Sequence, residues 1–275
     1  MVNSAAAPAK VNLTLHVTGR RADGYHLLDS LVAFAGVGDR ISVRPASDLS
    51  LSVAGPEAAE VPRDENNLVL KAARFMGVGD AAITLHKDLP VASGIGGGSS
   101  DAAATLKALA WMCGQPIPAG TEALGADVPV CLAAKASRMR GIGENVETVP
   151  SLPPVWCVLV NPRAALSTAA VFGALGRRDN PPMPDEIPSF GAAQDLALWL
   201  SGQRNDLEDP AVSCEPAIGP VLAALSAIPG CLLARMSGSG ATCFGLFEDE
   251  TRARDAAAAI LRENPKWWVR AAALS

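Results

Sequence analysis

The stretch PVASGIGGGSS, residues 90–100, decides how this chain folds. The alanine-rich segment DAAATLKALAWM follows it directly, and its composition and leucine spacing predict a helix. Glycines let backbone amides approach a ligand closely, and a helix N-terminus adds unpaired N–H groups with a partial positive charge. The sequence therefore predicts an anion-binding turn at the start of a helix.

A simpler alternative for this turn is a helix cap made by Ser99, Ser100 or Asp101. Four glycines within residues 94–98 are more than a cap needs, so we favour phosphate binding. The stretch lacks the lysine of the G-x-x-x-x-G-K-[ST] motif, and the serine at position 99 breaks the G-x-G-x-x-G pattern. Neither a P-loop NTPase nor a dinucleotide dehydrogenase is predicted.

The overall composition indicates a globular protein that binds a small molecule. The chain has 275 residues, 49% of them hydrophobic and 19% charged, which allows one large or two modest domains. A net charge of -5 argues against nucleic-acid binding, which needs a clustered basic surface. The N-terminal stretch has no signal-peptide pattern, and no run of about 18 apolar residues occurs, so we expect a cytoplasmic bacterial protein without membrane contact.

Cysteine and histidine usage gives no sign of a metal site. The six cysteines are scattered without C-x-x-C pairs, and most stand in apolar surroundings, which favours reduced core residues. Only three histidines are present, which argues against a histidine-based metal centre.

Alternating strand and helix signals predict an α/β (α+β) fold. A proline-rich linker within residues 146–162 indicates a boundary between domains 1–150 and 151–275, and residues 177–191 are expected to form a surface loop. Strands are predicted at 10–19, 39–45, 49–55, 81–90, 156–160, 232–247 and 267–274, and helices at 66–78 and 253–264 besides the one after the glycines.

Three motifs resemble those of the GHMP kinases, the superfamily of galactokinase, homoserine kinase, mevalonate kinase and phosphomevalonate kinase. PVASGIGGGSSDAA (90–103) resembles the central phosphate-binding motif, PAKVNLTLHV (8–17) the N-terminal motif and RMSGSGATCFGLF (235–247) the C-terminal glycine-rich motif. The resemblance covers most of the chain. It implies a two-lobe fold with a ribosomal protein S5 domain 2-like N-terminal lobe that binds ATP and a ferredoxin-like C-terminal lobe on the substrate side.

Finer motifs resemble one branch of these kinases. GRRADGYHLLDSLV (19–32), ENNLVLKAARFM (65–76) and LGADVPVCL (124–132) are similar to the branch that phosphorylates the 2-hydroxyl of 4-diphosphocytidyl-2-C-methyl-D-erythritol in the non-mevalonate isoprenoid pathway. A kinase for homoserine or mevalonate would keep the glycine motifs without the aromatic D-G-Y-H element. A catalytically silent nucleotide-binding module would most naturally have lost Lys10 or Asp127, and both are present.

Lys10 and Asp127 are the expected catalytic pair. From the residues alone, Asp127 in GADVP is an ordinary turn or helix-cap residue, and Lys10 is a solvated lysine at a strand edge. The resemblance implies that Asp127 is the general base for the substrate hydroxyl and that Lys10 orients this hydroxyl.

The resemblance also implies contacts to both substrates. Tyr25 and Phe172 would stack on the cytosine ring while His26 binds its edge, although a ring packed over a turn and a helix core residue remain alternatives for the two aromatics. ATP would bring Mg²⁺, whose protein ligands the sequence does not identify, and we expect a monomer or weak homodimer. The expected ATP contacts are Pro90, Gly94, Gly96, Gly97, Gly98, Ser99, Ser100, Asn67 and Lys87, and the expected substrate contacts are Asn12, Tyr25, His26, Thr168, Phe172 and Gly238.

One segment departs from the pattern of the family. CGQPIPAGTEALGADVP, which leads to Asp127, is several residues shorter than the family pattern. Pro116 and Pro118 disfavour a continuous helix there.

Overall fold

The computed structural model describes residues 2–275, which form two compact units made of separated chain segments. Strands β1 (Asn3–Asn12) and β3 (His26–Pro45) run from one unit into the other. The assignment of an ATP-binding domain before residue 150 and a substrate-side domain after it stays a prediction. The first unit holds the chain up to Lys10, residues 38–91 and residues 96–134, and the second holds residues 11–37, 92–95 and 135–275.

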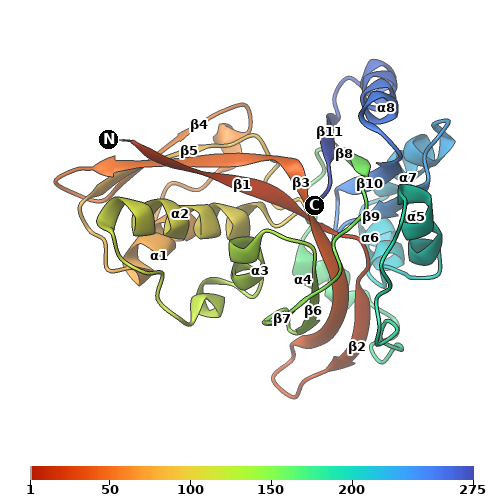
Figure 1. Ribbon diagram of the computed structural model, residues 1–275, viewed down its shortest axis with the longest axis horizontal. Coiled ribbons are helices and arrows are strands. Elements are labelled where there is room, and N and C mark those ends of the chain that lie inside the picture. Colours follow the sequence, from red (N-terminus) through yellow and green to blue (C-terminus); the bar gives the residue numbers. More distant parts are fainter. Residues whose placement is uncertain (1) are drawn as a thin grey trace. The chain divides into compact units, whose positions relative to one another are not determined.

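The first unit packs helices on a small mixed sheet. Strand β4 (Ser50–Ala54) runs parallel to β5 (Ala81–His86), and β5 pairs antiparallel with the end of β3, residues 40–45. Helix α1 (Leu68–Phe75) packs against α2 (Gly97–Cys113), and α2 packs against α3 (Val128–Ala133); α1 and α2 lie together beneath β4 and β5 in Figure 1. Two short 3-10 helices, Ala58–Glu60 and Thr121–Leu124, complete the unit.

Three of the predicted strands are wrong in their extent. The expected strand 232–247 is two strands, β9 (Leu233–Met236) and β10 (Cys243–Phe247), separated by a turn. The expected strand 10–19 is interrupted, since β1 ends at Asn12 and β2 covers His16–Arg20. The expected strand 39–45 is only the end of β3, which is 20 residues long. At Gly38 this strand passes close to the backbone of β1, where only glycine fits, because a Cβ on Gly38 would lie 2.2 Å from the carbonyl oxygen of Ala7.

The segment before Asp127 behaves as its prolines predict. Helix α2 ends with Gly114 in the left-handed conformation, and residues 115–120 contain no helix. The 3-10 helix that follows then leads into α3.

The second unit contains a four-stranded antiparallel sheet with the order β11-β8-β10-β9. Strand β8, a helical segment, β9, β10, helix α8 and β11 follow one another along the chain, which is the split βαβ arrangement of a ferredoxin-like fold. Helices α7 and α8 pack on this sheet from the same side (Figure 1). The elements are β8 (Trp156–Asn161), α4 (Thr168–Gly173), α5 (Ala193–Ser201), α6 (Glu208–Cys214), α7 (Ile218–Ala227), β9 (Leu233–Met236), β10 (Cys243–Phe247), α8 (Glu250–Glu263) and β11 (Trp268–Ala273).

Strands β2, β6 (Ser137–Gly141) and β7 (Asn145–Thr148) also belong to the second unit, where β2 and β6 pair with the first part of β3. Residues 177–191 form a loop, as predicted. A buried bidentate ion pair fixes this loop: Arg138 donates to both carboxylate oxygens of Asp29 at 2.7 and 2.8 Å and to the carbonyl oxygens of Met183 and Pro184.

The cysteines are free thiols, as expected. Cys131, Cys157 and Cys243 are buried, whereas Cys113 and Cys214 are exposed, so the expectation of core positions is wrong for those two. Among residues 2–275, no helix combines the length and apolar character needed to cross a membrane.

Candidate active site

The glycine-rich turn leads directly into helix α2. Gly96 is the N-cap residue, with φ of 66°, and the helix begins with Gly97 and Gly98. The alternative in which Ser99, Ser100 or Asp101 caps this helix is therefore wrong, because all three lie inside it. Glycine weakens a helix by about 1 kcal/mol relative to alanine, so two glycines in the first turn indicate a requirement for space or for exposed amides.

Lys10 and Asp127 come together in the first unit, although 116 residues stand between them in the sequence. The Lys10 Nζ lies 2.8 Å from Asp127 Oδ2; the lysine side chain is 5% exposed and the aspartate side chain is 33% exposed. Asp127 stands at the N-cap position of α3, but its side chain does not cap that helix. The carboxylate thus pairs with the lysine, while part of it stays accessible to a ligand.

The glycine turn lies directly on the Lys10 side chain. A Cβ on Gly96 would lie 3.1 Å from Lys10 Cβ and 3.3 Å from Lys10 Cε. The hydroxyl of Ser100 donates to the carbonyl oxygen of Pro8 at 2.7 Å, which ties the first turn of α2 to strand β1. An ammonium, a carboxylate and a helix N-terminus therefore meet in one place, an arrangement suited to a reaction at a phosphate group.

The two weaker ATP candidates have clear structural partners. Asn67 is the N-cap of α1: its Oδ1 accepts from the backbone N–H of Val69 at 2.9 Å, and its Nδ2 donates to the carbonyl oxygen of Pro62 at 2.6 Å. The ammonium of Lys87 pairs with the buried carboxylates of Asp39 and Asp101, at 2.5 and 3.0 Å. Direct contact of either side chain with ATP stays a prediction.

In the second unit, the SGSG turn (237–240) packs against another part of the glycine-rich stretch. A Cβ on Gly94 would lie 2.6 Å from the carbonyl oxygens of both Ser237 and Gly240, and the Ser237 hydroxyl donates to the carbonyl oxygen of Gly94 at 3.1 Å. A Cβ on Gly238, whose φ is 58°, would lie 2.7 Å from the carbonyl oxygen of Gly94 and 3.3 Å from Asn12 Oδ1. Only glycine permits these contacts, so the turn supports the backbone at Gly94.

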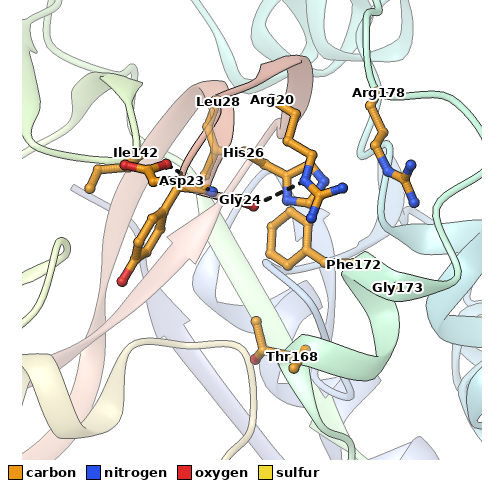
Figure 2. A pocket seen from close by; sticks show the side chains of 12 residues that line it. Arg20, Asp23, Gly24, His26, Leu28, Ile142, Thr168, Phe172, Gly173 and Arg178 are labelled. Atoms are coloured by element: carbon orange, nitrogen blue, oxygen red, sulfur yellow. Dashed lines mark hydrogen bonds between the residues drawn. The ribbon is translucent and has the colours of Figure 1, made fainter.

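A cavity of about 680 Å³ in the second unit collects most of the predicted substrate residues. The rings of His26 and Phe172 stack in it with their centroids 4.6 Å apart, and Figure 2 shows both rings together with the side chains of Arg20 and Arg178. Tyr25 also lines the cavity and is 61% exposed. The predicted partner of Tyr25, Phe172, is thus in ring contact with His26. The lining comprises Arg20, Asp23, Gly24, Tyr25, His26, Leu28, Ile142, Thr168, Ala169, Phe172, Gly173 and Arg178.

The pKa of His26, at the cavity wall, lies below its ordinary value. Burial lowers the pKa of this histidine, and the nearby guanidinium groups of Arg20 and Arg178 lower it further. Its Nε2 is buried and has no hydrogen-bond partner among the described residues. A buried nitrogen without a partner is costly, so a ligand with a polar ring edge would complete this site.

The other substrate candidates divide between the cavity and the core. Thr168 lines the cavity, and its hydroxyl forms a 2.8 Å hydrogen bond with the hydroxyl of Ser239 in the SGSG turn. Thr168 is the first residue of α4, and Ser167 caps this helix. Asn12 is 4% exposed and its Nδ2 donates to Ser30 Oγ at 2.8 Å, so its direct contact with a substrate stays a prediction.

Sequence reasoning did not identify several residues of these sites. Asp101 stands in the quoted motif but was considered only as a cap, and Asp39 was considered only as the first residue of a strand. Arg20 and Arg178 each stand in an Arg-Arg pair, and two adjacent basic residues beside a predicted turn could have indicated an anionic ligand.

Comparison with known families identifies both parts of the chain. A family profile described as "GHMP kinases N terminal domain" matches residues 67–137. A second one, "GHMP kinases C terminal", matches residues 187–266. The two matches contain the glycine turn with Asp127 and the SGSG turn, respectively.

Full-length relatives and solved structures agree with this result. The 4-diphosphocytidyl-2-C-methyl-D-erythritol kinase of Cereibacter sphaeroides is 57% identical over all of both chains, and that of Dinoroseobacter shibae is 56% identical over 96% of this chain and 92% of the relative. A crystal structure of 4-(cytidine 5'-diphospho)-2C-methyl-D-erythritol kinase matches with a TM-score of 0.78 and 36% identity over 99% of each chain. Homoserine kinase from Cytophaga hutchinsonii, with a TM-score of 0.64 and 16% identity over 100% of this chain and 94% of that one, shares the fold.

Proposed function

Because the chain belongs to the 4-diphosphocytidyl-2-C-methyl-D-erythritol kinase family of the GHMP kinases, we propose that it phosphorylates the 2-hydroxyl of 4-diphosphocytidyl-2-C-methyl-D-erythritol. The products are the 2-phosphate and ADP, and the reaction is a step of the non-mevalonate route to isoprenoid precursors. The chain is a kinase and, like other GHMP kinases, uses ATP.

The observation that carries this proposal is the Lys10–Asp127 pair beside Gly96. Asp127 accepts the proton of the 2-hydroxyl while that oxygen forms a bond to the γ-phosphorus. The bond from the γ-phosphorus to the bridging oxygen of ADP breaks, and ADP leaves with its electron pair. Lys10 keeps the carboxylate oriented and stabilises the negative charge that develops on the attacking oxygen.

Helix α2 supplies the environment for the phosphates of ATP. Its first-turn N–H groups at Gly97, Gly98 and Ser99 have no carbonyl partner within the helix. The partial positive charge of a helix N-terminus favours a phosphate there, and glycines leave the backbone open to it. Positioning and charge stabilisation are the main requirements of phosphoryl transfer, and this turn meets both.

Mg²⁺ belongs to this proposal as the ion that ATP carries on its phosphates. It keeps several waters and usually takes one or two carboxylates from a protein, so it does not need a cage of side chains. Among residues 2–275, no three metal-binding side chains come together. When bound, the ion neutralises charge on the phosphates.

The cavity in the second unit is suited to the diphosphocytidyl group. Its His26–Phe172 stack offers an aromatic surface for a pyrimidine, and Tyr25 stands exposed at the same cavity. The unpartnered Nε2 of His26 can hydrogen bond to the edge of cytosine. Arg20 and Arg178 make the cavity cationic, which matches a ligand that carries a diphosphate.

Phosphorylation assays with defined alcohols test the proposal. ADP release is measured with ATP, Mg²⁺ and 4-diphosphocytidyl-2-C-methyl-D-erythritol, with homoserine and mevalonate as competing candidates, and NMR of the product locates the new phosphate. We expect turnover only with the diphosphocytidyl alcohol and phosphate on its 2-oxygen. Turnover with homoserine or mevalonate instead would contradict the substrate assignment, and ADP binding without turnover on any alcohol would contradict the kinase mechanism.

A further inference from the structure

A buried cluster of three charged residues lies beneath the glycine turn in the first unit. Lys87, just after β5, donates through its Nζ to Asp39 Oδ2 at 2.5 Å and to Asp101 Oδ2 at 3.0 Å. The exposed fractions of Lys87, Asp39 and Asp101 are 3%, 2% and 4%. The cluster connects strand β3, the end of β5 and helix α2, which are far apart in the sequence.

The ammonium of this cluster touches the first residue of α2. A Cβ on Gly97 would lie 3.0 Å from Lys87 Nζ and 3.8 Å from Asp39 Oδ2. Asp101 stands one turn further along the same helix, so the ammonium lies beside Gly97 and donates to the Asp101 carboxylate. A shift of the ammonium would therefore shift the helix start.

The surrounding backbone holds Lys87 and Asp39 in place. The N–H of Lys87 donates to the carbonyl oxygen of Ala54 at 2.7 Å, and a Cβ on Gly55 would lie 2.5 Å from the Lys87 carbonyl oxygen. Asp39 Oδ1 accepts from the backbone N–H groups of Asp88 and Leu89 at 2.6 and 2.9 Å. Lys87 thus has a fixed position before any nucleotide binds.

The charge balance of the cluster indicates a role other than stability. Two carboxylates share one ammonium, and Asp101 Oδ1 is buried without a hydrogen-bond partner among residues 2–275. Burying these charges stabilises the fold less than well-packed apolar side chains would. The best-documented role of buried ionic groups is to hold neighbouring elements in one specific arrangement. The Lys87 side chain is 4% exposed, which leaves no open ammonium for a phosphate.

We propose that Lys87 is a positioning residue for ATP, which with Asp39 and Asp101 fixes the first turn of α2 so that the N–H groups from Gly97 onward meet the phosphates. This inference rests on the proposed ATP-binding role of the glycine turn. This positioning role differs from the direct contact of Lys87 with ATP that was expected from the sequence.

Substitution of the lysine, with a matched control on a neighbouring helix, tests the proposal. The Lys87→Met variant removes the ammonium and keeps a long unbranched side chain, and Lys87→Arg restores a cation. As the control, Lys71→Met makes the same change at an exposed position of α1. Misplacement of a phosphate-binding group by about 1 Å can cost about 100-fold, so we expect Lys87→Met to weaken ADP affinity and raise KM for ATP by about 10- to 100-fold. The KM for the alcohol should not change, Lys87→Arg should recover part of the loss, and Lys71→Met should behave as the unmodified protein.

Asp101→Asn separates positioning from direct contact. This change keeps the shape of the side chain and leaves one carboxylate for the ammonium. If Lys87 only positions α2, loss of either partner weakens ADP binding; if Lys87 contacts the nucleotide, Asp101→Asn frees the ammonium and binding does not weaken. Unchanged ADP affinity in Asp101→Asn would thus overturn the proposal, and this variant decides the question even where Lys87→Met does not fold.

Calorimetric titration with ADP is the readout because it needs no phosphate acceptor. An unmodified protein that binds ADP without phosphorylating the diphosphocytidyl alcohol would overturn the proposed function while leaving the Lys87 comparison readable. Lys87→Met and Asp101→Asn could instead lower the thermal stability and leave both the ADP affinity and the KM for ATP unchanged. That result would mean that the cluster only stabilises the fold, and it would overturn the positioning role.

Discussion

The two buried lysines of the first unit, Lys10 and Lys87, form ion pairs, whereas His26, Arg20 and Arg178 at the cavity in the second unit form none within the described part of the chain. Lys10 pairs with Asp127, and Lys87 pairs with two carboxylates, at distances of 3.0 Å or less. In the cavity, the Nε2 of His26 has no partner, and among residues 2–275 neither Arg20 nor Arg178 forms an ion pair. Changes in the first unit should therefore act on catalysis and stability, and changes at the cavity should act on the affinity for the alcohol.

The largest effect expected from this contrast is on turnover in Asp127→Asn. Asparagine keeps the shape of the side chain but cannot accept the hydroxyl proton. General-base catalysis contributes about 10²- to 10⁴-fold, and we expect kcat to fall by that amount. The affinity for ADP should stay nearly unchanged because the turn at Gly96 is intact. Steady-state kinetics and ADP titration measure the two quantities.

A matched control for this variant is Asp80→Asn, an exposed aspartate in the same unit. It should keep full kcat. Full activity of Asp127→Asn itself would remove Asp127 from the role of base and leave the Lys10 pair without a catalytic explanation.

A smaller effect, confined to the alcohol, is expected from Phe172→Ala. Stacking of a base on an aromatic ring contributes about 1–3 kcal/mol, so KM for the diphosphocytidyl alcohol should rise about 5- to 150-fold. The KM for ATP should not change. Phe190→Ala is the matched control, since Phe190 also packs on a ring, that of Trp199 at 5.7 Å, but does not line the cavity. Equal KM increases in both variants would contradict the stacking role.

The contrast between the units also explains what the sequence could predict. The helix after the glycines, strands β4, β5, β8 and β11 and helices α1 and α8 follow from local periodicity, since each buries one face of a regular element. The ferredoxin-like lobe was expected only from the resemblance, and the order of the four-stranded sheet confirms it.

Side-chain partners were harder to predict than elements. Lys87 was expected to contact ATP, and nothing in its neighbourhood indicates its two carboxylate partners, which stand 48 and 14 residues away. Nothing in the residues around Lys10 indicates Asp127, and only the resemblance connected them. Long-range pairs of this kind depend on the sheet topology, which periodicity does not encode.

A third effect concerns stability and arises from the unequal charges around Lys87. Burial raises the pKa of Asp101 to about 7, although Lys87 opposes this shift. An unfolded aspartate titrates near about 3.9, so between these values the folded protein keeps a proton that the unfolded chain has lost. The free energy of unfolding should fall as pH rises through this window, by at most about 1.4 kcal/mol per pH unit from this group.

Asp101→Asn removes that titration. Its free energy of unfolding, measured by urea denaturation between about pH 4 and pH 7, should fall less steeply with rising pH than that of the unmodified protein. Lys87 stays charged throughout because its pKa is raised. Asp80→Asn should keep the original slope, and an identical slope in Asp101→Asn would mean that Asp101 is ionised across the whole window.

The smallest expected effect is a change in the pKa of His26. It tests whether Arg20 and Arg178 lower this pKa in the protein without a ligand. Burial lowers this pKa first, and Arg20 and Arg178 lower it further, so Arg20→Gln should raise it toward the ordinary value. NMR titration of the ring protons measures the change. Arg177→Gln is the control, because Arg177 is paired with Asp179 at 3.0 Å and should leave His26 unaffected. An unchanged pKa in both Arg20→Gln and Arg178→Gln would mean that burial alone lowers the pKa of His26. The two arginines would then bind the diphosphate of the ligand without changing the charge state of the ring that contacts its base.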